Sequence, residues 1–200
     1  IVYMAGYTTS GNGDKDFITV TRNINNVWRN SATHSGLAGL DDEAMAITAD
    51  SSGNVYVTGR SQVSPTDTDI VTIKYDNSMN QQWISTYSGA AGLVDEPTDI
   101  VVDSSGQYVY VGGYVTTPGG EKDYILIEYD ASDGSEINTL ISNDPGEDYI
   151  AVVEMGEYND AIYMGGSQST TSMFVKKLDL SLNEIWNATP ATSGYIEAIT

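Results

Sequence analysis

The chain lacks cysteine and has few basic residues, and each shortage excludes a class of protein. Without cysteine there is neither a disulfide framework nor a thiolate metal site. Only 8 lysines and arginines stand against 28 aspartates and glutamates, which gives a formal net charge of −20. Such an acidic surface repels phosphate backbones, so we expect no nucleic-acid partner.

Long apolar runs and histidine clusters are also missing. No stretch approaches the ~18 apolar residues of a membrane helix, so this segment predicts no membrane span. His34 is the only histidine, and we interpret it as a solvated loop residue rather than part of a Ser-His-Asp site. The arginines Arg22, Arg29 and Arg60 are too few for a sialidase-like cluster. We therefore predict a protein without enzymatic activity, although carboxylate pairs for glycoside hydrolysis stay open because a sequence hides their separation.

A short pattern of apolar, tyrosine, apolar, small residue and glycine occurs four times. Its tyrosines stand at positions 3, 56, 110 and 163, so the steps are 53, 54 and 53 residues. A period of this length indicates a stacked or radial array of one structural unit. The glycines of the pattern are expected where a side chain would clash with the neighbouring unit, and they are Gly6, Gly59, Gly113 and Gly166.

Each unit contains four short β-rich runs bounded by Gly, Asp and Ser. In the second unit we expect strands over residues 43–49, 54–59 and 69–75, then one that contains Trp83. The intervening segment 50–53 is typical of a hairpin turn, because Asp and Ser bond their own backbone and Gly takes positive φ. Tryptophans recur in the last strand of three units and are expected to fill the outer gaps between packed sheets.

Four antiparallel strands in about fifty residues predict one blade of a β-propeller. A single four-stranded sheet cannot bury both faces, so blades must pack on one another. The expected fold is therefore an all-β propeller of four-stranded antiparallel blades, one domain over residues 1–200. Its repeat units are about 1–40, 41–94, 95–147 and 148–194, with 195–200 as the first strand of a further or closing blade.

The two ends of the chain are out of phase with the blades, so one blade is split between the termini. Residues 195–200 either pair with 1–8 of the same chain and close a four-bladed ring, or complete a blade of a neighbouring copy. A third interpretation makes the chain a piece of a larger ring, with flanking blades as its partners. Because Ile1 opens directly on a strand, we expect a processed chain or a part of a longer protein.

The repeat resembles a known family. Residues 42–59, DEAMAITADSSGNVYVTG, together with 69–76 and 82–87, are similar to the bacterial and archaeal β-propeller repeats called SBBP. The resemblance covers nearly the whole chain in four tandem copies. It implies a propeller fold and an extracellular or cell-surface location, usually within a larger multidomain chain. It implies no common catalytic activity.

Paired acids recur just before the third strand of three units. Side chains at i and i+2 of an extended segment share one face, so each pair favours a cation between its carboxylates. Calcium is the natural candidate, since it takes several hard oxygen ligands. The simpler interpretation, which we prefer, is that the acids cap a turn in water. The residues are Asp14, Asp16, Asp67, Asp69, Glu121 and Asp123.

Two other features point to the surface. A second acidic set precedes the first strand of each unit, at 41–43, 95–96 and 147–148, and we interpret it as a solvated rim at one mouth of the propeller. Asn187 begins a formal N-glycosylation acceptor, which Pro190 disfavours.

The function favoured by these patterns is that of an extracellular structural or interaction module, with head-to-tail assembly by strand complementation as its mode. Copies of itself or flanking blades would be its partners, and the only cofactor considered is calcium. The alternative is a propeller that binds a cell-surface glycan or protein at one mouth. Exposed tyrosines or tryptophans clustered on loops would favour that alternative.

Overall fold

Fifteen β-strands and no helix make up the described part of the chain. The computed structural model describes residues 1–23, 25, 27–142, 146–168 and 172–189. No helix able to span a membrane occurs in these ranges. The strands are β1 (Val2–Thr9), β2 (Lys15–Arg22), β3 (Trp28–His34), β4 (Asp42–Ala49), β5 (Val55–Ser64), β6 (Asp67–Tyr75), β7 (Gln81–Tyr87), β8 (Glu96–Val102), β9 (Tyr108–Thr116), β10 (Lys122–Asp130), β11 (Glu136–Ile141), β12 (Asp148–Met155), β13 (Ile162–Gln168), β14 (Ser172–Leu178) and β15 (Glu184–Ala188).

The strands form four antiparallel sheets in chain order, which confirms the predicted propeller blades. Blade 1 is β1–β3, blade 2 is β4–β7, blade 3 is β8–β11 and blade 4 is β12–β15. In each complete blade the strands follow one another in space as in sequence. Blade 1 has three strands among the described residues, and the segment 195–200 that we expected to complete a split blade lies outside them.

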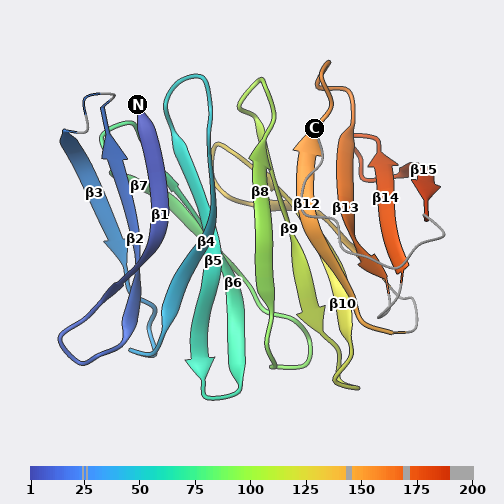
Figure 1. Cartoon of the computed structure of the whole chain (residues 1–200), viewed down its shortest axis with the longest axis horizontal. Coiled ribbons are helices and arrows are strands. Elements are labelled where there is room, and N and C mark those ends of the chain that lie inside the picture. The colour runs from blue at the N-terminus through green and yellow to red at the C-terminus, as the bar shows by residue number, and fades with distance from the viewer. Residues whose placement is uncertain (24, 26, 143–145, 169–171, 190–200) are drawn as a thin grey trace.

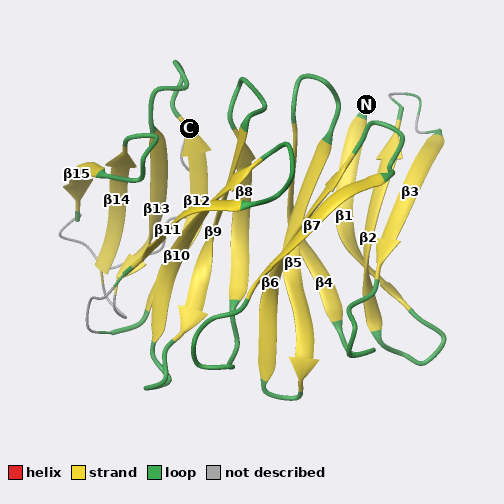
Figure 2. Ribbon diagram, turned by 180° about the vertical axis from the view of Figure 1, so that it is seen from behind, coloured by secondary structure: helices red, strands yellow, loops and turns green. Residues whose placement is uncertain are grey.

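The described blades stand side by side in an open row, with blade 1 and blade 4 at opposite ends (Figure 1). The first strands β4, β8 and β12 lie on the near face of that view and contact one another in succession. The outer strands β7 and β11 cross the opposite face (Figure 2). Successive blades therefore pack face to face, as the radial array requires.

The buried core lies between the blades rather than within a single sheet. One apolar cluster joins blades 1 and 2, a second joins blades 2 and 3, and a third joins blades 3 and 4. Two tyrosines of the repeat pattern, Tyr56 and Tyr110, belong to it and are fully buried. Packing thus supplies the interior that no isolated sheet has.

The hairpin turns follow the chemistry predicted from the sequence. Asp50 accepts hydrogen bonds from the backbone N–H groups of Ser52 and Asn54, both at 2.9 Å, and Gly53 has a φ of +82°. Asp103 and Gly106 repeat the arrangement in blade 3. A turn of this kind fixes the register of each inner hairpin.

The glycine of the repeat pattern lies against the first strand of its own blade. A Cβ atom at Gly59 would stand 2.1 Å from the carbonyl oxygen of Glu43, and the corresponding distances are 2.2 Å at Gly113 and 2.0 Å at Gly166. The prediction that these glycines avoid the neighbouring blade is supported at Gly59, where a Cβ would also stand 2.6 Å from the ring of Phe17 in blade 1. It was wrong at Gly113 and Gly166, whose nearest atoms belong to their own blades. At each of these places the first strand has an irregular register, which brings its carbonyl over the glycine.

Candidate functional site: the free edge of blade 1

The acid pairs predicted as calcium ligands lie at the start of β2 in blade 1, β6 in blade 2 and β10 in blade 3. In blade 2, Asp67 and Asp69 each have one buried carboxylate oxygen without a hydrogen-bond partner. Burial raises the pKa of Asp69, and the negative charge of Asp67 raises it further. A hydrogen bond from Ser88 opposes this shift. No group of three or more acidic, histidine or cysteine side chains placed to hold a metal occurs among the described residues. Calcium binding stays a prediction.

The second acidic set does not form a solvated rim, because its aspartates are buried. Asp42, Asp95 and Asp148 are 0%, 1% and 0% exposed. Asp42 accepts a hydrogen bond from the N–H of Gly36 in the loop that enters blade 2. Asp95 accepts the equivalent bond from Gly89 and a second from Thr116 N–H at 2.9 Å. These carboxylates fasten the crossover between blades, and the interpretation as a rim was wrong.

Buried acids give this protein an unusual expected response to pH. Burial raises the pKa of Asp95, Asp99 and Glu128, so their folded forms hold protons that the unfolded chain releases. Their contribution to stability is full below the ordinary carboxyl pKa and is lost as pH rises through the raised values. Hydrogen bonds from Asn80 and Asn183 instead lower the pKa of the turn residues Asp76 and Asp179, whose contribution is lost only at still lower pH.

We therefore expect the melting temperature to be higher at about pH 5 than at about pH 7.5. Partial protonation also reduces the self-repulsion of a chain with net charge −20, which acts in the same direction. Differential scanning calorimetry at constant ionic strength measures the effect. A melting temperature that is equal at the two pH values, or higher at about pH 7.5, would contradict the role assigned to the buried acids.

His34 is half-buried at the end of β3, so its interpretation as a solvated loop residue was wrong. Its ring meets that of Phe17 edge-on, with the centroids 5.8 Å apart. Burial lowers the pKa of the imidazole, and the charges of Asp42 and Asp16 oppose the shift. Asn187 lies on the exposed outer strand β15, so the structure leaves its side chain accessible.

Ionic contacts link the inner ends of the first three blades. Lys15 of blade 1 pairs with Glu43 of blade 2, and Arg60 reaches Glu43 at 3.3 Å. Arg60 also pairs with Glu96 of blade 3. Lys15 and Arg60 thus hold neighbouring blades together through ion pairs.

The inner edge of blade 1 differs from that of every other blade. By the repeat pattern, β1 corresponds to the second strand of the other blades. That strand is hydrogen-bonded on both sides in blades 2 to 4, whereas β1 pairs with β2 alone among the described residues. A Cβ atom at Gly6 would meet nothing within 4 Å. Val2 and Met4 are 49% and 38% exposed, while Val55 at the equivalent place in blade 2 is 0% exposed. Among the described residues, one side of β1 therefore has no paired strand, and its glycine is uncovered.

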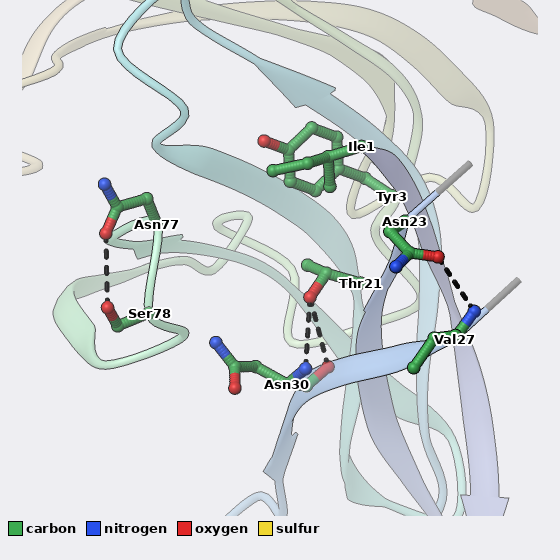
Figure 3. A pocket seen from close by; sticks show the side chains of 8 residues that line it. All are labelled: Ile1, Tyr3, Thr21, Asn23, Val27, Asn30, Asn77 and Ser78. Atoms are coloured by element: carbon green, nitrogen blue, oxygen red, sulfur yellow. Dashed lines mark hydrogen bonds between the residues drawn. The ribbon is translucent and has the colours of Figure 1, made fainter. Parts of the chain in front are cut away.

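A polar cavity of about 430 Å³ lies beside this edge (Figure 3). Two of its side chains bond to nearby backbone: Thr21 Oγ1 accepts from the Asn30 backbone N–H at 3.2 Å, and Asn23 Oδ1 accepts from the Val27 backbone N–H at 3.0 Å. Tyr3 and Ile1 of the β1 end form one of its walls. None of the described lining side chains is an aspartate, glutamate, lysine, arginine or histidine.

The comparison with protein families matches residues 38–65 to SBBP, described as a beta-propeller repeat. The match spans β4, the turn after it and β5, the hairpin whose glycine lies under the first strand. This chain contains an SBBP repeat. The resemblance noted in the sequence is confirmed at that hairpin, and blades 3 and 4 have the same strand order around the same glycine.

The sequence matches no curated protein. Among solved structures, one described as the crystal structure of the eukaryotic initiation factor is similar, with a TM-score of 0.54 and 9% sequence identity. The similarity covers 95% of this chain and 44% of that one. It shows the fold alone, and the SBBP-containing chain spans less than half the length of that structure.

The far end of the row of blades has an open surface of its own. In blade 2, Trp83 and Lys74 lie across from each other, and both donate to the carbonyl oxygen of Ala131 in blade 3, at 3.1 and 2.6 Å. Blade 4 repeats the pair as Trp186 and Lys177. Trp186 is 42% exposed, against 7% for Trp83. Blade 4 thus shows an uncovered copy of a surface that blade 2 buries against its neighbour.

Proposed function

We propose that this protein is a non-enzymatic assembly module whose copies join head to tail. The propeller repeat itself indicates a binding or structural module. The observation that carries the proposal is the unpaired β1 edge. Gly6 has open space there, whereas the first strand of the blade occupies the equivalent space at Gly59 and its counterparts. A sheet edge with this shape binds an added strand through main-chain hydrogen bonds.

The incoming strand is residues 195–200 of another copy. Tyr195-Ile196 repeats the order of Tyr149-Ile150, and Ile150 pairs with Gly166 in blade 4. The same register would put Ile196 opposite Gly6. The neighbour's blade 1 would then cover the Trp186 surface of blade 4, as blade 3 covers Trp83. One docking event would therefore complete blade 1 of one copy and bury the Trp186 surface of the other at the same time.

We also propose that assembly takes place outside the cell or at its surface. A net charge of −20 supports this, because it favours solubility in salty surroundings and repels nucleic acid. Glycan or protein binding at one mouth stays a prediction. Tyr158, 81% exposed in the turn after β12, is a lone aromatic side chain there, so the described loops offer no aromatic cluster in its favour.

Sedimentation velocity across a concentration series tests the assembly. We expect the intact chain to form oligomers whose size grows with concentration, and a chain without residues 195–200 to stay monomeric. A peptide of residues 191–200 should bind the shortened chain in a one-to-one ratio. Gly6→Val should abolish peptide binding without lowering the melting temperature of the monomer, since its Cβ has free space until a strand docks.

Gly11→Val is the matched control, because a Cβ at that loop position also meets nothing within 4 Å but lies outside β1. It should assemble as the parent chain does. A monomer at every concentration, with slow hydrogen exchange at the β1 amides that becomes fast on removal of 195–200, would instead mean closure within one chain and would overturn the proposal. The series is run with and without calcium, so that a calcium-dependent change appears separately.

A further inference from the structure

A second cavity lies between blades 1 and 2, on the side of the loop that joins them. Its volume is about 610 Å³. His34 at the end of β3 and the loop that follows it to Ala38 form one wall, and β5, β6 and β7 form the other. The volume falls within the range of small-molecule binding sites. The proposed assembly makes no use of it.

Two side chains at this cavity are smaller than their counterparts at the next interface. Ser61 is opposite Asp69 in blade 2, and at the same place in blade 3 Val115 is opposite Asp123. Val115 is 6% exposed and belongs to the core between blades 2 and 3. His34 likewise stands where blade 2 has Tyr87, which packs on that core. The opening is therefore a feature of one interface and not of the repeat.

The walls are mainly apolar. Val63, Val71 and Ile84 face the cavity from the strands, and Leu37 lies fully exposed at its rim. A soluble surface seldom leaves such a group of aliphatic side chains uncovered around a hollow without a ligand. The walls fit the hydrocarbon body of a small molecule.

One polar group is set into these walls. Asp69 lines the cavity with only 9% of its surface exposed, and its Oδ1 atom has no hydrogen-bond partner. A buried carboxylate oxygen without a donor is costly, and a bound cation that donates hydrogen bonds removes that cost. Asp67 adds negative charge close by, as its effect on the pKa of Asp69 shows. The chain itself offers this oxygen no ion pair among the described contacts.

We propose that this cavity binds a small amphipathic amine, whose ammonium group donates to Asp69 Oδ1 and whose hydrocarbon part lies along Val71 and Ile84. The half-buried imidazole of His34 stands at the same wall and reports occupancy. Charge complementarity selects an ammonium over a carboxylate of the same length, and the strongly acidic surface concentrates cations near the entrance.

Titration with n-octylammonium chloride, followed by NMR of the His34 imidazole, tests the proposal. His34 is the only histidine of the chain, so its ring protons give one assignable signal. We expect a saturable shift with n-octylammonium, at least tenfold weaker binding of n-octanol, and no shift with octanoate. Isothermal calorimetry provides the dissociation constants.

Two variants separate the apolar walls from the carboxylate. Ser61→Val copies the residue of the next interface and lies opposite Asp69, so it should narrow the cavity there and weaken binding of both the amine and the alcohol. Asp69→Asn keeps the shape and removes the charge, so the two probes should then bind within about twofold of each other. Glu121→Gln is the control. It removes one negative charge, as Asp69→Asn does, but from an exposed residue of blade 3, so it should leave every dissociation constant unchanged.

Three results would overturn the proposal: a His34 signal that no probe moves, equal affinity of the parent chain for amine and alcohol, or unchanged amine binding in Ser61→Val. Thermal unfolding of each variant checks its fold. If Asp69→Asn proves unfolded, the parent chain's preference among the three probes and the Ser61→Val titration still decide the question.

Discussion

Replacing Gly59 with alanine is expected to destabilise the protein severely, whereas the same replacement at Gly6 should leave the monomer as stable as before. The new Cβ at Gly59 would stand 2.1 Å from the carbonyl oxygen of Glu43 and 2.6 Å from the ring of Phe17. The carbonyl belongs to the paired strand β4, so relief requires the inner hairpin to shift. Overpacking of this kind costs about 3 kcal/mol or more.

At Gly6 the same methyl group enters open space. The change there should stay within about 0.5 kcal/mol, or stabilise slightly through the loss of unfolded-state entropy. Urea unfolding at a concentration where the chain is monomeric measures both variants. Gly113→Ala and Gly166→Ala should behave like Gly59→Ala, since their methyl groups meet first-strand carbonyls at 2.2 and 2.0 Å. Equal effects at Gly6 and Gly59 would mean that β1 already carries a fourth strand in the monomer.

Trp83→Ala is expected to cost about 3–5 kcal/mol of unfolding free energy. The indole is 7% exposed and packs between Tyr56 and Tyr129, with ring centroids 6.1 and 6.4 Å away. Its Nε1 donates to Ala131 in the next blade, and Gly134 approaches so closely that a Cβ there would touch the ring at 2.6 Å. Removal of the ring therefore opens a cavity at the blade 2–blade 3 interface and takes away one of the two donors to the Ala131 carbonyl oxygen.

Trp186→Ala is the matched control, because the same position in blade 4 is 42% exposed and packs on Tyr163 alone among the described aromatic rings. We expect a cost below about 1 kcal/mol in the monomer. Chemical unfolding of both variants gives the difference. The role assigned to Trp83 would fail if the two substitutions had similar costs in the monomer, whereas a loss of oligomers with Trp186→Ala would support the docking surface.

Local chemistry could be predicted well from this sequence. The segment 50–53 specified its turn, because an aspartate that bonds its own backbone and a glycine at positive φ work within a few residues. Strand positions followed from short apolar runs in the same way, and the predicted third strand 69–75 lies within β6. Trp83 was rightly expected to fill a gap between sheets.

The candidate site was harder to predict, because its properties depend on what is packed nearby. Asp42 and Asp95 look like surface acids in the sequence, and only the returning loops at Gly36 and Gly89 show that they are buried. His34 looked solvated for the same reason. A signal was nevertheless present: Ser61 and Val115 occupy the same repeat position and differ in size, so an alignment of the four units would have marked the blade 1–blade 2 interface as unusual.

The sequence alone determined the repeat, the four sheets and the turn chemistry, since a period of 53 or 54 residues and short-range hydrogen bonding need no knowledge of distant contacts. Only the tertiary structure decided which residues at the same repeat position also have the same surroundings. Gly6 and Gly59, or Trp186 and Trp83, occupy the same places in their repeats, yet one of each pair is covered and the other is open. The reason is physical: burial depends on the neighbouring strand or blade, and a row of blades has two ends where that neighbour is not part of the described chain.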